Sequence, residues 1–156
     1  MKKIQVLAAT VAIGFASLSL HAESIKLKAT LTGGEEVPAK QVSGTGTLTA
    51  TFDTDTNTLK YHVEYQGLTG PVVAAHFHGP ADPGTNAKPQ IPVKAPFDSP
   101  VDGAANVTAD QAKDLLDGKW YFNLHTSTNP GGELRGQVVK AQCCSCVKGR
   151  GLLQVC

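Results

Sequence analysis

The segment TGTLTATFDTDTNTLKYHVEYQ, residues 45–66, shows the two-residue alternation that is typical of half-buried β-strands. Its first part alternates leucine, alanine and phenylalanine with threonine, which predicts a strand with one apolar face and one polar face. The polar run at 53–58 predicts a turn. In residues 59–66, leucine, tyrosine and valine alternate with polar side chains in the same way. The segment therefore predicts two successive strands of an all-β domain.

Similar alternation predicts the other strands of the chain, at 24–31, 72–79, 90–97, 119–126 and 133–141. Only residues 109–116 have a helical composition. Thr108 and Gln111 have the spacing of an N-terminal capping box, and Gly118 is suited to end the helix. Seven or so short strands separated by turns are typical of a sandwich. We therefore expect an all-β, Greek-key β-sandwich with one short helix.

The first 22 residues have the features of a signal peptide. Lys2 and Lys3 precede an apolar run, and the small residue Ala22 is suited to cleavage. The run is shorter than the about 20 apolar residues of a spanning helix, and no later segment comes close to that length. We expect an exported protein, periplasmic or secreted, with a signal peptide at 1–22, one domain at 23–141 and a tail at 142–156.

The charge balance argues against nucleic acid as a partner. The chain has 14 basic and 13 acidic residues, and loss of Lys2 and Lys3 with the leader leaves 12 basic ones, a net charge near −1. No basic run or patch is visible in the sequence. Proteins that bind nucleic acid usually carry such a patch. We therefore do not expect nucleic acid as the partner.

All four cysteines lie in the tail, as Cys143, Cys144, Cys146 and Cys156. An exported protein can form disulfides, and four cysteines allow three complete pairings, although neighbours in sequence seldom bond each other. The spacing fits no paired C-x₂-C zinc motif. We interpret the tail as an extension with one or two disulfides, while a thiolate site for Cu(I) or zinc stays open as an alternative.

The segment AAHFHGP, residues 74–80, contains two histidines at positions that share one face of a strand. His76 and His78 would lie about 6.6 Å apart, close enough to bind one metal ion. His125 shares a predicted polar face with Tyr121 and Asn123. Pairing of strands 59–66 and 72–79 would also place His62 opposite His76. The pattern predicts a metal site at His76, His78 and His125, whereas His62 taken alone is more simply a solvated residue.

Five blocks of the sequence, taken together, resemble the CHRD domain family, which is named after chordin. They are LTGGEEVPA, SGTGTLTATFD, LKYHVEYQGLTGPVVAAHFHGPA, LLDGKWYFNLHT and NPGGELRGQV. They occur in the order of the family and extend from about residue 24 to residue 141. In chordin these domains belong to an extracellular antagonist of growth factors. The resemblance therefore implies an extracellular β-domain, but it does not specify an activity.

Three motifs also resemble the Cu,Zn superoxide dismutases, which share an immunoglobulin-like sandwich: GLTGPVVAAHFHGP, LHT and GGELRGQV. This resemblance implies copper ligands at His76, His78 and His125, with His62 as a fourth ligand or a neighbour. It implies that Arg135 guides superoxide to the metal. A second set of zinc ligands and a cysteine beside Arg135 are absent from the sequence. We therefore expect one copper ion, with zinc as the less favoured metal.

Three functions remain open at this point. The first is copper binding with mononuclear superoxide-dismutase-like activity. The second is an extracellular binding or adhesion module without a metal, and the third is a periplasmic copper carrier whose tail thiols hold Cu(I). Arg135 is equally compatible with a structural pairing to Glu133 or to the strand edge. We interpret Glu35 and Glu36 as turn residues, with partner binding as the less favoured alternative.

Overall fold

The computed structural model describes residues 23–141. The predicted signal peptide at 1–22 and the predicted cysteine-rich tail at 142–156 lie outside the described residues. Those two predictions therefore stay predictions. Within 23–141, no helix is long and apolar enough to cross a membrane.

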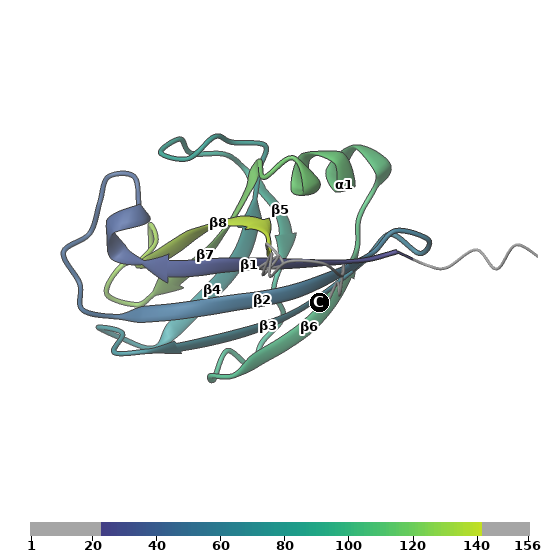
Figure 1. Ribbon diagram of the computed structural model, residues 1–156. Helices are drawn as coiled ribbons and strands as arrows, with labels where there is room; N and C mark the ends of the chain where they lie inside the picture. The colour runs from purple at the N-terminus through teal and green to yellow at the C-terminus, as the bar shows by residue number, and fades with distance from the viewer. Residues whose placement is uncertain (1–22, 142–156) are drawn as a thin grey trace, which may run out of the picture.

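Eight antiparallel strands and one short α-helix form the domain (Figure 1). In chain order the elements are β1 (Ser24–Thr32), the 3₁₀ turn η1 (Gly33–Glu35), β2 (Thr45–Asp53), β3 (Thr58–Gln66), β4 (Val72–His78), β5 (Pro89–Pro92), β6 (Val101–Asn106), α1 (Ala109–Leu116), β7 (Trp120–Thr126) and β8 (Leu134–Lys140). The predicted all-β fold class with one short helix is confirmed.

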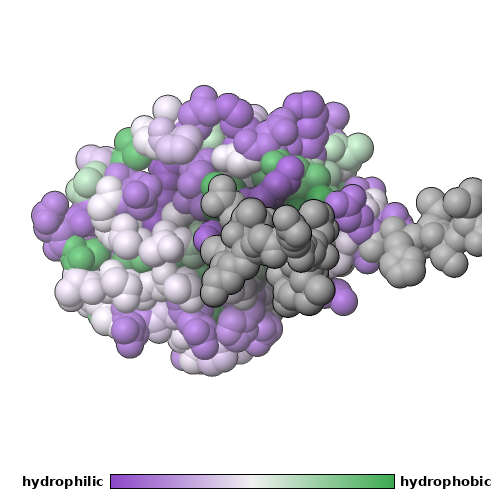
Figure 2. Space-filling model, in the orientation of Figure 1, coloured by the Kyte–Doolittle hydropathy of each residue, from purple (hydrophilic) through white to green (hydrophobic). Residues whose placement is uncertain are grey.

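The strands form one continuous sheet in the order β5-β4-β7-β8-β1-β2-β3-β6. The sheet curls so that its two halves enclose a common core, and β1, β2, β3 and β6 run side by side in Figure 1. Phe77 of β4 lies between the halves, with its ring centroid 5.2 Å from that of Tyr61 on β3 and 4.9 Å from that of Phe122 on β7. The face visible in Figure 2 is largely hydrophilic, with small separate hydrophobic patches. This is the surface expected of a sandwich whose apolar side chains point inward.

The predicted strand–turn–strand unit at 45–66 is the hairpin of β2 and β3, whose ends pair Asp53 with Thr58. One carboxylate oxygen of Asp53 accepts hydrogen bonds from the backbone N–H groups of Asp55 and Thr56, at 3.0 and 2.9 Å. Asn57 adopts a φ of 50°, a conformation that asparagine tolerates better than most residues. Local turn chemistry therefore sets the register of the hairpin.

The predicted pairing of strand 59–66 with strand 72–79 was wrong. Strand β3 pairs with β2 and β6, whereas β4 pairs with β5 and β7. The segment 67–71 crosses between the halves of the sandwich and does not form a hairpin. The second neighbour of β3, besides β2, is β6, a strand that the sequence analysis did not predict. Its residues VDGAAN have little apolar alternation, and Gly103 is required there because a Cβ would overlap the Tyr61 ring.

Helix α1 has the predicted capping box. The Gln111 N–H donates to Thr108 Oγ1 at 3.2 Å, and the Thr108 N–H donates to Gln111 Oε1 at 3.0 Å. Gly118, with a φ of +72°, follows the helix as predicted. Two buried side chains of the helix, Ala112 and Leu115, join the core.

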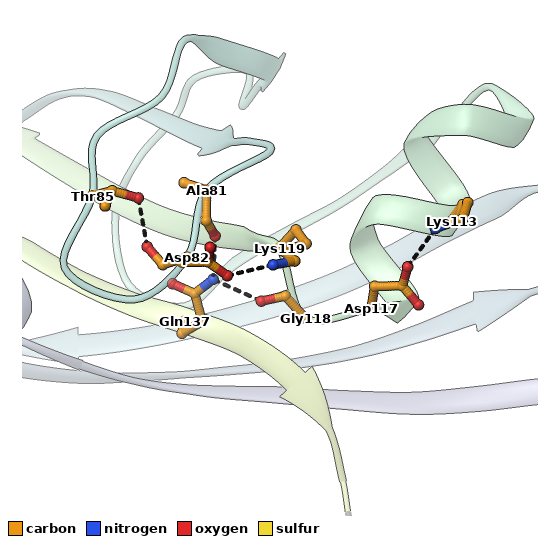
Figure 3. Close-up of polar contacts among 8 residues, drawn as sticks. All are labelled: Ala81, Asp82, Thr85, Lys113, Asp117, Gly118, Lys119 and Gln137. Carbon is orange, nitrogen blue, oxygen red and sulfur yellow. Dashed lines mark hydrogen bonds and ion pairs between the residues drawn. The ribbon is translucent and has the colours of Figure 1, made fainter.

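Hydrogen bonds from a side chain of β8 link the end of this helix to the segment that follows β4. The Nε2 of Gln137 donates to the carbonyls of Gly118 and Ala81, at 2.7 and 3.0 Å (Figure 3). Lys119 also forms an ion pair with Asp82. The segment 79–88 is thereby held against the polar face of β7 and β8, which is the face that carries the predicted site.

Candidate metal site

The polar face of β4, β7 and β8 is not a solvated face but a second, polar interior. The cross-strand pairs place His76 beside Asn123, and Asn123 beside Arg135. The alternation along β7 is as predicted, with Trp120, Phe122 and Leu124 in the apolar core. Nevertheless Asn123 is only 3% exposed and Arg135 only 2%. Groups buried in this way must find partners within the protein.

Three predicted ligands converge on this face. One ring nitrogen from each of His76, His78 and His125 lies within 4.8 Å of the other two. The ring centroids are 5.2 Å apart for His76 and His125, and 5.5 Å apart for His76 and His78. A metal ion about 2.0–2.1 Å from each nitrogen separates such nitrogens by roughly 3–4 Å. Small side-chain rotations are therefore sufficient to bind one ion.

Each of the three histidines has one ring nitrogen that forms no hydrogen bond within the described residues. The Nδ1 of His78 lies 3.0 Å from the carbonyl of Ala87, and the Nδ1 of His125 lies 3.0 Å from the carbonyl of Pro130. Because a carbonyl only accepts, each Nδ1 carries the proton, and in the neutral ring Nε2 then has a lone pair. These two Nε2 atoms and the Nδ1 of His76 are buried without a partner among the described residues.

This arrangement is the one that metal-binding histidines adopt. A ligating histidine commonly donates its second ring N–H to a carbonyl or carboxylate, which fixes the tautomer and the ring plane. Buried polar atoms without partners are otherwise rare in folded proteins. The three unpartnered ring nitrogens are thus available to a shared ligand; the Nε1 of Trp120, in the apolar core, is a further unpartnered buried atom among residues 23–141.

The electrostatic surroundings favour neutral imidazoles. Burial lowers the pKa of His76, and the neighbouring His125 lowers it further. Burial also lowers the pKa of His78, and this effect exceeds the opposite effect of the hydrogen bond to Ala87. Since metal binding requires the deprotonated ring, both histidines are prepared for a metal ion at neutral pH.

His62 is not brought to the cluster. Its Nδ1 lies 2.7 Å from a carboxylate oxygen of Asp102 on β6, and its Nε2 lies 3.6 Å from a carboxylate oxygen of Glu64. The predicted proximity to His76 depended on pairing β3 with β4, and these strands are not neighbours in the sheet. The hydrogen bond to Asp102 raises the pKa of His62, in contrast to the histidines of the cluster.

Arg135 forms contacts that the sequence analysis did not name. It does not pair with Glu133, whose carboxylate accepts hydrogen bonds from Thr69, Thr126 and Asn129. Its guanidinium is buried and lies over the ring of Tyr121, with Cζ 3.5 Å from the ring centroid. Since it does not line the surface, its burial does not favour the predicted role of a surface cation that guides superoxide.

Two residues of the site were missed by the sequence analysis. Tyr121 stacks on His78, with ring centroids 4.8 Å apart and planes 8° apart. Glu36, predicted as a turn residue, is buried and accepts a hydrogen bond of 2.6 Å from the Nδ2 of Asn123. Burial raises the pKa of Glu36, although Asn123 and the charges of Arg135 and Lys40 oppose the rise. No local pattern in the sequence indicates either contact.

Comparison with known proteins identifies the domain. The family model for the CHRD domain matches residues 27–138, nearly the whole described part of the chain. This match confirms the resemblance that the five sequence blocks indicated. No curated protein matches the chain, and no solved structure matches it either. The similarity to superoxide dismutases therefore stays a prediction from motifs.

Proposed function

The chain belongs to the CHRD domain family, and we propose that its domain binds one copper ion through His76, His78 and His125. The observation that carries the proposal is the convergence of three buried, unpartnered imidazole nitrogens from β4 and β7. Family membership supports an extracellular or periplasmic β-domain in general terms. We further propose a periplasmic or secreted location, which agrees with the leader-like residues 1–22.

The order of metal affinities favours copper over zinc. Imidazole nitrogen suits both metals, but a given set of nitrogen ligands binds Cu(II) more tightly than zinc, and three protein ligands leave positions open for water or a small anion. A hydrolytic zinc site generally uses a nearby base to accept a proton from bound water. Glu133, in the loop between β7 and β8, already accepts hydrogen bonds from Thr69, Thr126 and Asn129. That carboxylate is therefore engaged in holding the loops.

We propose superoxide as the small anion and dismutation as the activity. Bound copper would supply one-electron redox cycling, which dismutation requires. His76 and His125 are partly exposed, so the ligand set lies close to the protein surface, where a small anion would have a short way to enter. The buried charge of Arg135 gives the site a positive potential without lining a channel. The protein's contribution is thus a rigid, neutral ligand set in a positive environment.

Cu(II) electron paramagnetic resonance tests the binding. The protein should carry serine at the four tail cysteines, so that thiols cannot bind the metal. We expect one equivalent of a nitrogen-coordinated signal, which His76→Ala combined with His78→Ala abolishes and the matched control His62→Ala retains. No stoichiometric signal in the parent protein, or an equal loss in His62→Ala, would contradict the proposal. A superoxide assay on the copper-loaded protein then tests the activity.

A further inference from the structure

A buried cation lies behind one of the three ligands. The ring of Tyr121 is placed between the ring of His78, at 4.8 Å, and the guanidinium of Arg135, whose Cζ is 3.5 Å from its centroid. The planes of His78 and Tyr121 differ by only 8°. The guanidinium carbon therefore lies within about 8 Å of the His78 ring, a range in which charges interact appreciably inside a protein.

The charge of Arg135 is not cancelled by an ion pair. Its Nη1 donates to the Oδ1 of Asn86 at 2.9 Å, and its Nη2 donates to the carbonyl of Thr85 at 2.6 Å. Both acceptors are neutral. None of the ion pairs among residues 23–141 includes Arg135. Glu36 is the carboxylate whose pKa responds to this guanidinium, but its hydrogen bond is with Asn123.

The same side chain also fixes the backbone that orients His78. Arg135 holds Thr85 and Asn86, and the next residue, Ala87, accepts from the Nδ1 of His78 at 3.0 Å. The N–H of Ala87 donates to the hydroxyl of Tyr121 at 3.1 Å. Arg135, Tyr121 and Ala87 thereby define both the plane and the tautomer of one ligand ring.

Burying a cation among neutral acceptors is costly, because the hydrogen bonds and the aromatic face only partly replace its hydration. A buried charge is therefore weak evidence for stability.

A positive charge close to a metal ion disfavours the more highly charged oxidation state. At about 10 Å and an effective dielectric constant of about 20, one additional positive charge on the metal is repelled strongly enough by the guanidinium to change the Cu(I)/Cu(II) ratio roughly tenfold.

We propose that the charge of Arg135 favours Cu(I) over Cu(II) in the three-histidine site, while its contacts with Tyr121 and the backbone at 85–86 hold His78 in place. The inference rests on the proposed copper site and goes beyond it, because it assigns a redox bias to a residue that does not contact the metal. It also replaces the role of an anion guide that the dismutase motif implied for Arg135.

The reduction potential of the copper-loaded chain without its leader, with serine at the four tail cysteines so that thiols cannot bind Cu(I), tests the proposal. In Arg135→Gln, which removes the charge, we expect the Cu(I)/Cu(II) ratio at a fixed potential to fall about tenfold, or about 59 mV for one electron. Arg135→Lys keeps the charge and should stay within about threefold of the parent protein. Mediated redox titration of the Cu(II) signal measures both variants.

A second variant keeps the test decisive if Arg135→Gln fails to fold. Asn86→Asp places a carboxylate on the atom that already accepts from Arg135, and so neutralises the charge in place. It should lower the Cu(I)/Cu(II) ratio in the same direction as Arg135→Gln. Gln66→Glu, at the exposed end of β3, is the matched control for an added carboxylate and should change the ratio less.

The outcomes separate the two proposals. If the parent protein binds copper and Arg135→Gln and Asn86→Asp leave the ratio unchanged, the redox role of Arg135 is wrong and the copper site stands. An equal shift in Arg135→Lys and Arg135→Gln would show that shape, and not charge, sets the potential. If the parent protein binds no copper, both proposals fall together.

Discussion

His78 and Tyr121 lie opposite each other on β4 and β7, and their rings stack with centroids 4.8 Å apart. The cross-strand pairing sets the positions of the two side chains, and the carbonyl of Ala87 fixes both rings, since it accepts from His78 and from the tyrosine hydroxyl at 3.3 Å. The contact converts a flexible imidazole into an oriented one. Orientation of this kind is what a metal ligand gains from its surroundings.

Removal of the stack should weaken copper binding. In Tyr121→Leu the His78 ring loses its stacking partner, and we expect the copper affinity to fall about tenfold or more. Tyr121→Phe keeps the stack and loses only the bonds to Ala87, so its loss should be smaller. Competition with a chelator of known affinity measures both. Equal affinity in the parent protein and Tyr121→Leu would show that the stack does not orient the ligand.

The histidines should titrate in two groups in the metal-free protein. The hydrogen bond to Asp102 raises the pKa of His62 above its ordinary value of 6.5, whereas burial lowers the pKa of His76 and His78. Imidazole NMR signals followed against pH measure this order. Asp102→Asn should bring the pKa of His62 down and leave His76 and His78 in place. A lower pKa for His62 than for His76 would contradict the geometry.

The two groups of histidines should also change the free energy of unfolding with pH in opposite directions. The His62–Asp102 pair stabilises the fold fully below pH 6.5, and this contribution is lost as the pH rises through the raised pKa of His62. For His76 and His78 the unfolded chain binds protons more readily. Their contribution is therefore lost as the pH falls from 6.5 through their lowered pKa values. Urea unfolding of His76→Ala across this range should show a weaker loss on acidification than the parent protein.

Gly132 should be intolerant of a side chain. Its φ is +126°, and a Cβ would lie 2.7 Å from Glu36 Oε1 and 2.8 Å from Asn123 Oδ1. We expect Gly132→Ala to destabilise the fold by about 1–3 kcal/mol, measured by urea unfolding. The neighbouring Gly131 has open space around its Cβ position, and Gly131→Ala is the matched control. Equal stabilities of the two variants would show that the buried Glu36–Asn123 contact is not formed.

The carboxylate of Glu133 should be required to hold the loops around β7. It accepts from the N–H and the hydroxyl of Thr69, each at 2.7 Å, and also from Thr126 and Asn129. Glu133→Gln turns an amide donor toward these donors, so we expect a loss of about 1–3 kcal/mol. The exposed Glu35→Gln is the control, and thermal unfolding compares the two. An unchanged melting temperature in Glu133→Gln would contradict the network.

The stabilisation that Glu133 gives to the fold should decrease when the pH is lowered. Burial alone would raise the pKa of Glu133, but the hydrogen bonds from Thr126, Thr69 and Asn129 together hold it below its ordinary value of 4.5. The stabilisation is therefore present above pH 4.5 and is lost as the pH falls through the lowered pKa. Glu133→Gln should remove this part of the acid sensitivity.

Much of the fold could be predicted from local patterns. Two-residue alternation located β1 to β4, β7 and β8, and it assigned the apolar and polar faces of β7 correctly, because strand geometry fixes which residues share a face. Capping chemistry located α1. The strand β6 was missed because its residues, VDGAAN, are mostly small or polar and show little apolar alternation, and Gly103 is there because a Cβ would overlap the Tyr61 ring.

The convergence of His76, His78 and His125 could be predicted from the sequence for a physical reason. The spacing of His76 and His78 is local, and His125 was assigned to the correct face of its strand, so the three residues that meet were all named. The position of His62 depended on strand pairing, which a local pattern does not specify. The contacts of Arg135 with Tyr121 and the backbone at 85–86 join residues far apart in the sequence. No motif encodes such contacts.

A crystal structure of the copper-loaded protein tests the central claim most directly. Data collected at the copper absorption edge locate the metal independently of any assumption about its ligands. We predict one anomalous peak about 2.0 Å from a nitrogen of each of His76, His78 and His125. A peak at His62 and Asp102 or at the tail cysteines, with none among the three histidines, would contradict the account.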